Sequence, residues 1–299
     1  MDLSIIIVNY KTQDLTLQTL GSVFKAQSPK GKMEVILVDN GSEDNTPKLA
    51  KKKFPQLKVI VSSENLGFAG GNNLGMRKAK GRYVLLLNSD TLIKKDTLIK
   101  MVDFMDKHPK AGLATCRVNL FHGGLDPASH RGFPAPWAAF TYYSRLEKFL
   151  PQSKFFGQYH QGWKNLKTTH QIDSPTGAFF FLRKKALNQV GLLDEAFFMY
   201  AEDLDLAYRV KQAGWQIMFT PITQITHLKG ASGLKKKVKQ KLNFKAKAIR
   251  IKITKDFFQA MKIFYNKHYK KKYFFPLRWL VFFAIDLIKA LRIFKIKLS

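Results

Sequence analysis

Residues 34–42 read Glu-Val-Ile-Leu-Val-Asp-Asn-Gly-Ser, an apolar run that ends in a carboxylate and a turn. Two similar runs, at 4–8 and 83–87, are also followed by polar or turn residues, as in buried parallel strands. An amphipathic pattern at 12–26 and a shorter one at 46–54 predict helices between these strands. This alternation predicts an open α/β sheet, whose ligand sites collect at the carboxyl ends of the strands.

The rest of the chain is less regular. Residues 121–169 are rich in His, Pro, Gly, Tyr and Trp, which predicts long loops or short helices that cover a substrate. Further strands are predicted at 58–61, 178–182 and 216–220, and further helices at 184–190 and 203–213.

The composition excludes several classes of protein. The chain has 299 residues, of which 45% are hydrophobic, and 51 Lys and Arg against 21 Asp and Glu give a net charge of +30. A chain this apolar can bury a large core, so it is not a disordered polycation. Residues 229–299 hold 21 basic and 2 acidic residues (+19), which leaves +11 for residues 1–228. The tail therefore differs in kind from the rest of the chain.

The single cysteine, Cys116, excludes an intramolecular disulfide framework and fits a core position in a reducing compartment. The amino terminus passes directly into the run 4–8, without the basic start or the small-residue cleavage site of a secretory signal. Both features predict a cytosolic domain.

Asp39 stands where the second strand is predicted to end, just before a turn, and Asn9 follows the first strand. A carboxylate at this edge can accept a hydrogen bond from the N3–H group that both uracil and thymine carry. The alternative is an ordinary turn or helix-cap aspartate, since Asp-Asn-Gly-Ser is also common turn chemistry. Asp39 is thus a candidate contact for a pyrimidine nucleotide.

A segment rich in glycine and asparagine, residues 65–75, is predicted to be a loop that enters a helix at 73–79. Glycine lets backbone N–H groups approach a phosphate or a ribose, and a helix start favours an anion. The segment does not match G-x-G-x-x-G, and the pattern G-x-x-x-x-G-K-[ST] is absent from the chain. These facts argue against a dehydrogenase and against a P-loop nucleotidase.

Three further segments carry candidate chemistry. Asp90 follows the third apolar run, where it either caps a turn or helps phosphates hold Mg²⁺. Glu202, Asp203 and Asp205 open a helix behind an aromatic run, so they are either favoured first-turn charges or a general base beside an apolar wall. His227 follows the last predicted strand and is a candidate partner of Asp90 in space.

In their order and spacing these motifs resemble family 2 glycosyltransferases with the GT-A fold, and most closely the bacterial rhamnosyltransferase-like branch that builds surface polysaccharides. The resemblance spans nearly all of residues 1–230. It is carried by segments 7–10, 38–42, 65–75, 87–90, 176–178, 198–206, 213–215 and 226–227. The fold it implies is a Rossmann-like, mixed and mostly parallel sheet flanked by helices, followed here by a basic amphipathic helical extension.

The resemblance also implies roles for single residues. The donor nucleotide is expected on Asn9, Tyr10, Asp39, Asn65, Gly67, Gly70, Asn72, Asn73, Asn88, Ser89 and Asp90. The expected ligands of a divalent cation, Mg²⁺ or Mn²⁺, are Asp90 and His227, although the family's Asp-x-Asp motif reads Asn88-Ser89-Asp90 in this chain. Asp203 is the expected catalytic base with Glu202 beside it, and acceptor contacts are expected from Thr176, Gly177 and Arg131.

The implied reaction moves a sugar, with inversion, from a nucleotide-sugar to a hydroxyl of a polysaccharide or lipid-linked glycan in cell-surface glycan synthesis. dTDP-rhamnose is the favoured donor and a UDP-sugar is the other one. Two other classes stay open on the residues alone. A charge of +30 also attracts nucleic acid, but that function leaves the acidic motifs unexplained, so no nucleic-acid partner is expected. A sugar nucleotidyltransferase shares the fold class, but the glycine-rich basic loop expected near its amino terminus is missing here.

The tail is predicted to form a second unit, residues 231–299, after a catalytic domain at 1–230. Segment 274–298 is apolar but carries too many charges for a transmembrane helix, which needs about 20 apolar residues. Its charges Arg278, Asp286, Lys289 and Arg292 share one sector of a helix, as in a helix that lies on anionic lipid. The alternative is a helix that completes the soluble core. We therefore expect a cytoplasmic enzyme held peripherally at the inner face of the cell membrane.

Overall fold

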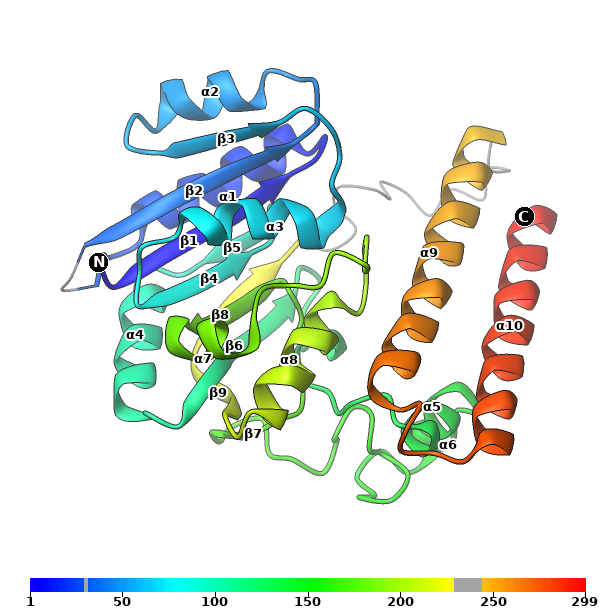
Figure 1. Cartoon of the computed structure of the whole chain (residues 1–299). Coiled ribbons are helices and arrows are strands. Elements are labelled where there is room, and N and C mark those ends of the chain that lie inside the picture. Colours follow the sequence, from blue (N-terminus) through cyan, green and yellow to red (C-terminus); the bar gives the residue numbers. More distant parts are fainter. Residues whose placement is uncertain (30–31, 229–243) are drawn as a thin grey trace.

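The computed structural model describes residues 1–29, 32–228 and 244–299. Its centre is a sheet with the strand order β3-β2-β1-β4-β8-β6-β9-β5, and β7 pairs with β9 (Figure 1). The strands are β1 (Leu3–Asn9), β2 (Met33–Asn40), β3 (Lys58–Ser62), β4 (Tyr83–Leu87), β5 (Thr91–Ile93), β6 (Ala111–Leu120), β7 (His170–Gln171), β8 (Phe179–Arg183) and β9 (Gln216–His227). Six of these nine strands in the described residues run in one direction, so the predicted mixed, mostly parallel α/β sheet is confirmed.

Helices cover both faces of the sheet. They are α1 (Gln13–Lys25), α2 (Thr46–Lys53), α3 (Gly67–Lys78), α4 (Thr97–Lys107), the 3₁₀ turn η1 (Pro127–Ser129), α5 (Pro136–Tyr143), α6 (Leu146–Phe149), α7 (Lys184–Val190), α8 (Glu202–Gln212), α9 (Phe244–His268) and α10 (Phe275–Leu298). One apolar cluster packs α1, α2 and α4 on the sheet, and a second packs α3, α7 and α8 on the opposite face. The apolar runs of the central strands therefore have no polar face, because both of their faces are covered.

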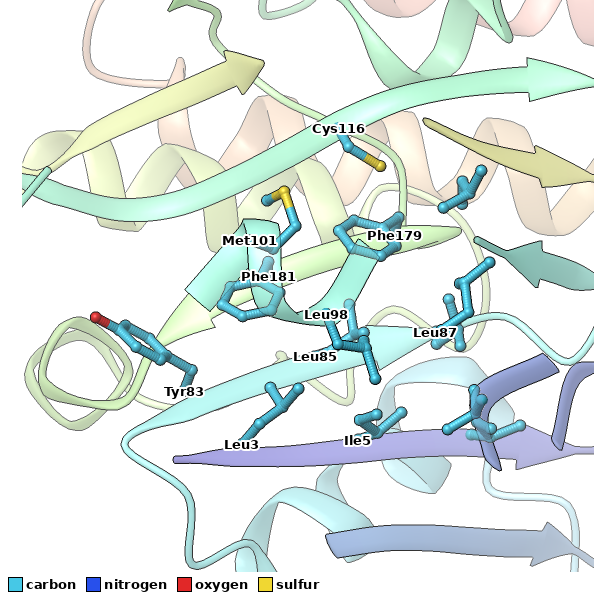
Figure 2. Packing of buried hydrophobic residues seen from close by; sticks show 14 of the residues in the cluster. Leu3, Ile5, Tyr83, Leu85, Leu87, Leu98, Met101, Cys116, Phe179 and Phe181 are labelled. Carbon is cyan, nitrogen blue, oxygen red and sulfur yellow. The ribbon is translucent and has the colours of Figure 1, made fainter. Parts of the chain in front are cut away.

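Strand register places side chains in layers. Ile5, Leu85 and Phe181 stand side by side on β1, β4 and β8 and point into the first cluster (Figure 2). Their chain neighbours Ile6 and Leu86 point into the second cluster, since successive strand residues face opposite sides. Cys116 is buried in the first cluster, as expected for a core cysteine.

Several elements differ from the sequence-based prediction, which also placed no helix at α4, no separate helix at α9 and no strand at β5 or β7. Strand β6 was missed, although most of its residues are buried, because Gly, Thr and Arg interrupt its apolar pattern. Helix α3 begins at Gly67 and not near residue 73. Strand β9 continues past residue 220 to His227, since its register with β6 shifts after the Cys116–Thr220 pair and passes over Pro221, which has no N–H to donate.

The C-terminal helices α9 and α10 run side by side at one end of the molecule (Figure 1). Helix α9 packs on α8 through an aromatic cluster in which Tyr208 contacts the rings of Phe264 and Tyr269. The buried carboxylate of Asp205 on α8 accepts hydrogen bonds from His268 at 2.7 Å and from Arg209 at 2.8 Å, and lies 2.8 Å from Lys267. The predicted boundary between two units, at residues 230 and 231, lies outside the described residues.

The contacts of Asp205 predict that part of the free energy of unfolding is lost in acid. Burial opposes ionisation of Asp205, but hydrogen bonds from His268 and Lys267 and the charge of Arg209 outweigh it and lower the pKa to about 2 from 3.8. The ionised form therefore stabilises the fold by about 2 kcal/mol above pH 4, and this gain is lost as the pH falls toward 2. Urea unfolding of Asp205→Asn should show a lower free energy at neutral pH and a shallower loss below pH 4 than the wild type. The control is Asp103→Asn, which alters an exposed carboxylate on α4 and should follow the wild-type curve; parallel acid limbs for Asp205→Asn and wild type would contradict the assignment.

Candidate active site

The carboxyl ends of β1 and β2 bring Asn9 beside Asp39, as the parallel register requires. The amide Nδ2 of Asn9 donates to Asp39 Oδ1 at 2.7 Å and to Ser42 Oγ at 3.0 Å. The backbone N–H of Ser42 donates to the other carboxylate oxygen of Asp39 at 3.3 Å. Asn9 and Asp39 are both buried, so Asn9 acts first as a positioning residue for Asp39, and Tyr10 is the exposed neighbour on this edge.

A chain of hydroxyl groups connects this edge to the Asn88-Ser89-Asp90 turn. The amide oxygen of Asn9 accepts from Thr12 Oγ1 at 3.0 Å and from Thr16 Oγ1 at 2.8 Å. The Thr12 hydroxyl lies 3.1 Å from that of Ser89. Two segments predicted independently from the sequence, around residues 9 and 89, are thus tied together.

Asn40 fixes the segment that follows β3, although no role was predicted for this residue. Its Nδ2 donates to Asn65 Oδ1 at 3.1 Å and to the Gly67 carbonyl at 2.9 Å, while its Oδ1 accepts from the Leu66 N–H at 3.1 Å. Gly67 has φ +72°, and a Cβ atom there would lie 2.2 Å from the Phe198 carbonyl oxygen. Only glycine fits this approach between α3 and the segment that leads to Glu202.

The expectation of a donor loop over residues 65–75 requires correction, because most of this segment is helix α3. A Cβ atom at Gly71 would lie 2.9 Å from Val8, and one at Gly75 would lie 2.5 Å from Ile6, so these two glycines serve close packing of the helix on the sheet. A Cβ atom at Gly70 would lie 2.7 Å from the Leu66 side chain, in the turn just before it.

The two asparagines of α3 also have partners within the protein. Asn72 Nδ2 donates to the Phe68 carbonyl at 2.9 Å. Asn73 donates to the Leu193 carbonyl at 2.9 Å and to Glu195 at 2.7 Å, and accepts from the Leu193 N–H at 3.1 Å. Of the predicted donor residues in this segment, Asn65 and Gly67 therefore lie at the start of the helix, toward the sheet edge, whereas Asn73 anchors the chain around residue 194.

Asp90 and His227 meet, as the sequence predicted. The His227 Nε2 atom lies 3.2 Å from Asp90 Oδ1, and the backbone N–H of Leu228 donates to the Asp90 carbonyl at 2.7 Å. On the other side of the ring, His227 Nδ1 lies 2.8 Å from Oδ2 of Asp126, which is fully buried. Burial acts to lower the pKa of His227, but hydrogen bonds to Asp126 and Asp90 outweigh it and raise the pKa to about 9.

This arrangement fits a divalent cation completed by a substrate. A buried carboxylate that binds Nδ1 typically orients a metal-ligating histidine so that Nε2 faces the metal. Asp126 binds the Nδ1 atom of His227 in the same way. The Oδ1 atom of Asn88, at the position of the family's first aspartate, is buried without a hydrogen-bond partner in the described part of the chain. The described residues hold no cluster of three His, Cys, Asp or Glu side chains for a metal, so phosphate and water would supply the remaining ligands. Sequence reasoning missed Asp126, since Asp before Pro127 reads as a turn.

Asp203 lies in the first turn of α8 within a set of donors. Its Oδ2 accepts from Arg131 Nη2 at 2.6 Å and from the Gly177 N–H at 3.2 Å, and its Oδ1 accepts from the Leu204 N–H at 2.7 Å. Arg131 and Gly177 were expected to bind an acceptor, and in the structure they hold the proposed base. Thr176 is half-buried beside Gly177. Acceptor contact by these three residues stays a prediction.

Glu202 is buried beside Asp203, and its Oε2 atom has no hydrogen-bond partner in the described part of the chain. Burial and the negative charge of Asp203 raise the pKa of Glu202 well above its ordinary value. The preceding residues Tyr200 and Ala201 have φ values of +74° and +64°, which cost about 1–2 kcal/mol each for residues with a Cβ atom. Backbone strain at Tyr200 and Ala201 therefore accompanies the placement of Glu202 and Asp203.

The sequence of the chain matches a known protein family. The model of Glycosyl transferase family 2 matches residues 4–191. The chain belongs to glycosyltransferase family 2. Family membership favours the glycosyltransferase prediction over nucleic-acid binding and over sugar nucleotidyl transfer.

Relatives place the chain within this family. It is 28% identical over 212 residues to the N-acetylglucosaminyl-diphospho-decaprenol L-rhamnosyltransferase of Mycobacterium tuberculosis, which covers 67% of this chain and 68% of that protein. It is 26% identical to the low-salt glycan biosynthesis hexosyltransferase Agl10 of Haloferax volcanii, over 76% of this chain and 67% of that protein. The resemblance to the rhamnosyltransferase-like branch is confirmed by these relatives.

Solved structures agree on the fold. The mannosyltransferase PcManGT from Pyrobaculum calidifontis, in complex with GDP-Man and Mn²⁺, superposes with a TM-score of 0.59 at 17% identity and covers 99% of this chain and 72% of that one. S. aureus TarS 1-349 superposes with a TM-score of 0.55 at 19% identity, over 87% of this chain and 81% of that one. This family 2 glycosyltransferase therefore has the GT-A fold that the sequence predicted.

Proposed function

We propose that this enzyme moves a sugar, with inversion at the anomeric carbon, from a nucleotide-sugar to a hydroxyl of a polysaccharide or lipid-linked glycan in cell-surface glycan synthesis. One observation carries the proposal. The Asn9–Asp39 pair, the Asp90–His227 pair and the Glu202–Asp203 pair all follow strands or open a helix at one end of a GT-A sheet. These are the parts that a donor nucleotide, its diphosphate and an acceptor hydroxyl each require.

Asp203 is the proposed general base. It takes the proton of the acceptor hydroxyl, which then attacks the anomeric carbon from the side opposite the departing nucleoside diphosphate. Arg131 holds the Asp203 carboxylate at 2.6 Å and balances its charge before the proton arrives. Glu202, with a raised pKa and an unpartnered Oε2, is placed to bind the acceptor hydroxyl or an adjacent one as a hydrogen-bond donor.

Charge on the departing diphosphate needs compensation at the other side of the site. A divalent cation, Mg²⁺ or Mn²⁺, bound there would neutralise that charge as it develops. Asp90 and His227 would hold it, with Asn88 as an oxygen donor and Asp126 behind the histidine. Similar GT-A structures were solved with Mn²⁺, which supports this part of the proposal.

dTDP-rhamnose is the donor that we favour, because the relative in Mycobacterium tuberculosis is named as an L-rhamnosyltransferase. A UDP-sugar is the alternative, since S. aureus TarS was solved in complex with UDP-GlcNAc. Both donors carry a pyrimidine N3–H group, from which Asp39 is proposed to accept a hydrogen bond.

The test of this function is a thermal-shift screen of dTDP-, UDP- and GDP-sugars with and without Mn²⁺, followed by transfer assays with the best donor. A true donor at 100 times its Kd stabilises the fold by about 2.7 kcal/mol, which is a clear rise in melting temperature. A pyrimidine nucleotide-sugar should raise it more than a GDP-sugar does, and Asp39→Asn should reduce the rise. Equal responses to all nucleotide-sugars, or to none, would argue against the proposed donor site.

Asp126, the carboxylate behind His227, provides a separate prediction. Asp126→Asn should weaken Mn²⁺-dependent donor binding by about 10–100-fold, because loss of the carboxylate behind a ligating histidine costs about that much. Calorimetric titration of Mn²⁺ in the presence of the nucleoside diphosphate measures it. Asp106→Asn, which changes a carboxylate bound to Arg82 and Tyr83 at the start of β4, is the control. Equal Mn²⁺ affinity in Asp126→Asn and wild type would remove Asp126 from this role.

We also propose that helix α10 lies against the inner face of the cell membrane in the cytoplasm. No helix in the described residues is both long enough and apolar enough to cross a membrane. The outer face of α10 nevertheless carries a stripe of large apolar side chains that are 48–72% exposed: Trp279, Phe283, Leu287, Leu291, Phe294 and Leu298. Such a stripe, beside a tail with a net charge of +19, supports contact with anionic lipid.

A further inference from the structure

A cavity of about 850 Å³ opens between α5, α9 and α10, against the first turn of α8. Its walls are aliphatic and aromatic, with Trp137 from α5, Met261 from α9 and Ala284 from α10 among them. No Lys, Arg, Asp or Glu of the described residues lines it. Its volume lies in the range of about 300–1,000 Å³ that is typical of ligand sites. The walls are therefore complementary to an apolar ligand.

The cavity is continuous with the proposed catalytic pair. Ala201 and Leu204 line it, and Glu202 and Asp203 lie between them in the chain. Pro134 lines the same cavity and follows closely after Arg131, which binds Asp203. A molecule that fills the cavity thus has one end at the residues that are proposed to take a proton from the acceptor.

The cavity is elongated and has cations at one end. Along α10 its wall runs from Leu277 to Ile288, which is about 16 Å at the helical rise per residue. One turn beyond Ile288, the Arg292 guanidinium lies 5.3 Å from the ring centre of Phe258, another wall residue. Lys252 Nζ lies 5.8 Å from the Phe198 ring, just before the acid pair.

The ion pairs of the described residues distinguish the cations on these two helices. Among the residues that the structure describes, Arg292 and Lys252 form no ion pair with a carboxylate, whereas Lys262 and Lys289 of the same two helices bind Asp286. A long apolar chamber that ends in unpaired cations beside a catalytic carboxylate is complementary to a molecule with a hydrocarbon chain and an anionic head.

We propose that this cavity holds the isoprenoid chain of a diphosphate-linked glycan acceptor, with the diphosphate near Arg292 and Lys252 and the sugar hydroxyl at Asp203. The proposal deepens the proposed function and rests on it, because only a glycosyltransferase needs an acceptor at Asp203. Helix α10 has one face in the cavity wall and its outer face exposed and apolar, so a chain can pass between the bilayer and the cavity along the same helix.

The test uses geranylgeranyl diphosphate as the probe and the full-length chain, with binding measured by calorimetry. Wild-type protein should bind one molecule, and inorganic diphosphate should bind at least about tenfold more weakly, because most of the affinity comes from the chain. Ala284→Phe narrows the cavity and should weaken binding of the probe by about tenfold or more. The matched control is Ala290→Phe, which makes the same change on an exposed position of α10 and should leave binding unchanged.

Ala139→Phe on α5 narrows the cavity from the opposite wall and replaces Ala284→Phe if that variant does not fold. Arg292→Gln should weaken binding of geranylgeranyl diphosphate but not binding of geranylgeraniol, which has no anionic head. Equal binding of the probe to Ala284→Phe or Ala139→Phe and wild type would overturn the proposal, as would equally tight binding of dodecyl phosphate. Absence of binding to wild-type protein that still responds to a nucleotide-sugar overturns the cavity assignment alone and leaves the proposed function intact.

Discussion

Asp203→Asn is expected to lower turnover by about 10²–10⁴-fold, because general-base assistance typically contributes that much to the rate. The change keeps the shape of the side chain, and the amide oxygen can still accept a hydrogen bond from Arg131 or from the Leu204 N–H. Donor affinity is therefore expected to stay at its wild-type value. Initial rates of transfer, together with calorimetric titration of the donor nucleotide, separate the two effects.

The control for this variant is Asp194→Asn, which changes a carboxylate that binds Lys267 at 2.5 Å on the C-terminal helix. It should leave the rate of transfer unchanged. Glu202→Gln is expected to raise the KM for the acceptor more than it lowers kcat, since Glu202 is proposed to bind the acceptor and not to take its proton. A folded Asp203→Asn enzyme with wild-type turnover would show that another group is the base.

Arg131→Leu is expected to lower the free energy of unfolding by about 3–5 kcal/mol, because it leaves the Asp203 carboxylate buried without its charge partner. The two side chains are only 11% and 12% exposed and lie 2.6 Å apart, so water does not replace the lost partner fully. The variant should also bind acceptor and transfer sugar poorly. Urea unfolding at neutral pH measures the change in stability.

A double-mutant cycle provides the control for Arg131. In an Asp203→Asn background the carboxylate charge is already absent, so Arg131→Leu should cost much less stability than it does in the wild type. The difference between the two costs measures the coupling of the pair. An equal cost in both backgrounds would mean that Arg131 acts through packing and its bond to the Pro175 carbonyl at 3.2 Å, and not through Asp203.

The contacts between the C-terminal helices change the interpretation of the basic tail. The sequence placed Arg278, Asp286, Lys289 and Arg292 in one polar sector of an interfacial helix. In the structure Asp286 binds Lys262 of α9 at 2.7 Å and Lys289 at 2.6 Å, so part of this sector holds the two helices together. The outward face of α10 is the apolar one. Helix α10 thus packs on α9 and keeps an exposed apolar face, and its contact with lipid stays a prediction.

The sequence by itself determined six of the nine strands that the structure describes, several of the helices and the polar residues at the strand ends. Apolar runs and helical periodicity are local patterns, so they specify which residues are buried without knowledge of the partner. The positions of Asp39 and Asp90 follow in turn, because the carboxyl ends of parallel strands share one edge of the sheet. The family resemblance added the expected roles of Asp203 and His227.

Only the tertiary structure decided which side chains meet at that edge. The contacts of Asp126 with His227, of Arg131 with Asp203 and of Asn40 with the start of α3 join residues that are distant in the chain. Such pairs depend on strand register and on the path of irregular segments, and neither leaves a periodic signal in the sequence. For the same reason the cavity between α5, α9 and α10 has no sequence signature, since its walls come from three helices whose apolar residues each look like ordinary core.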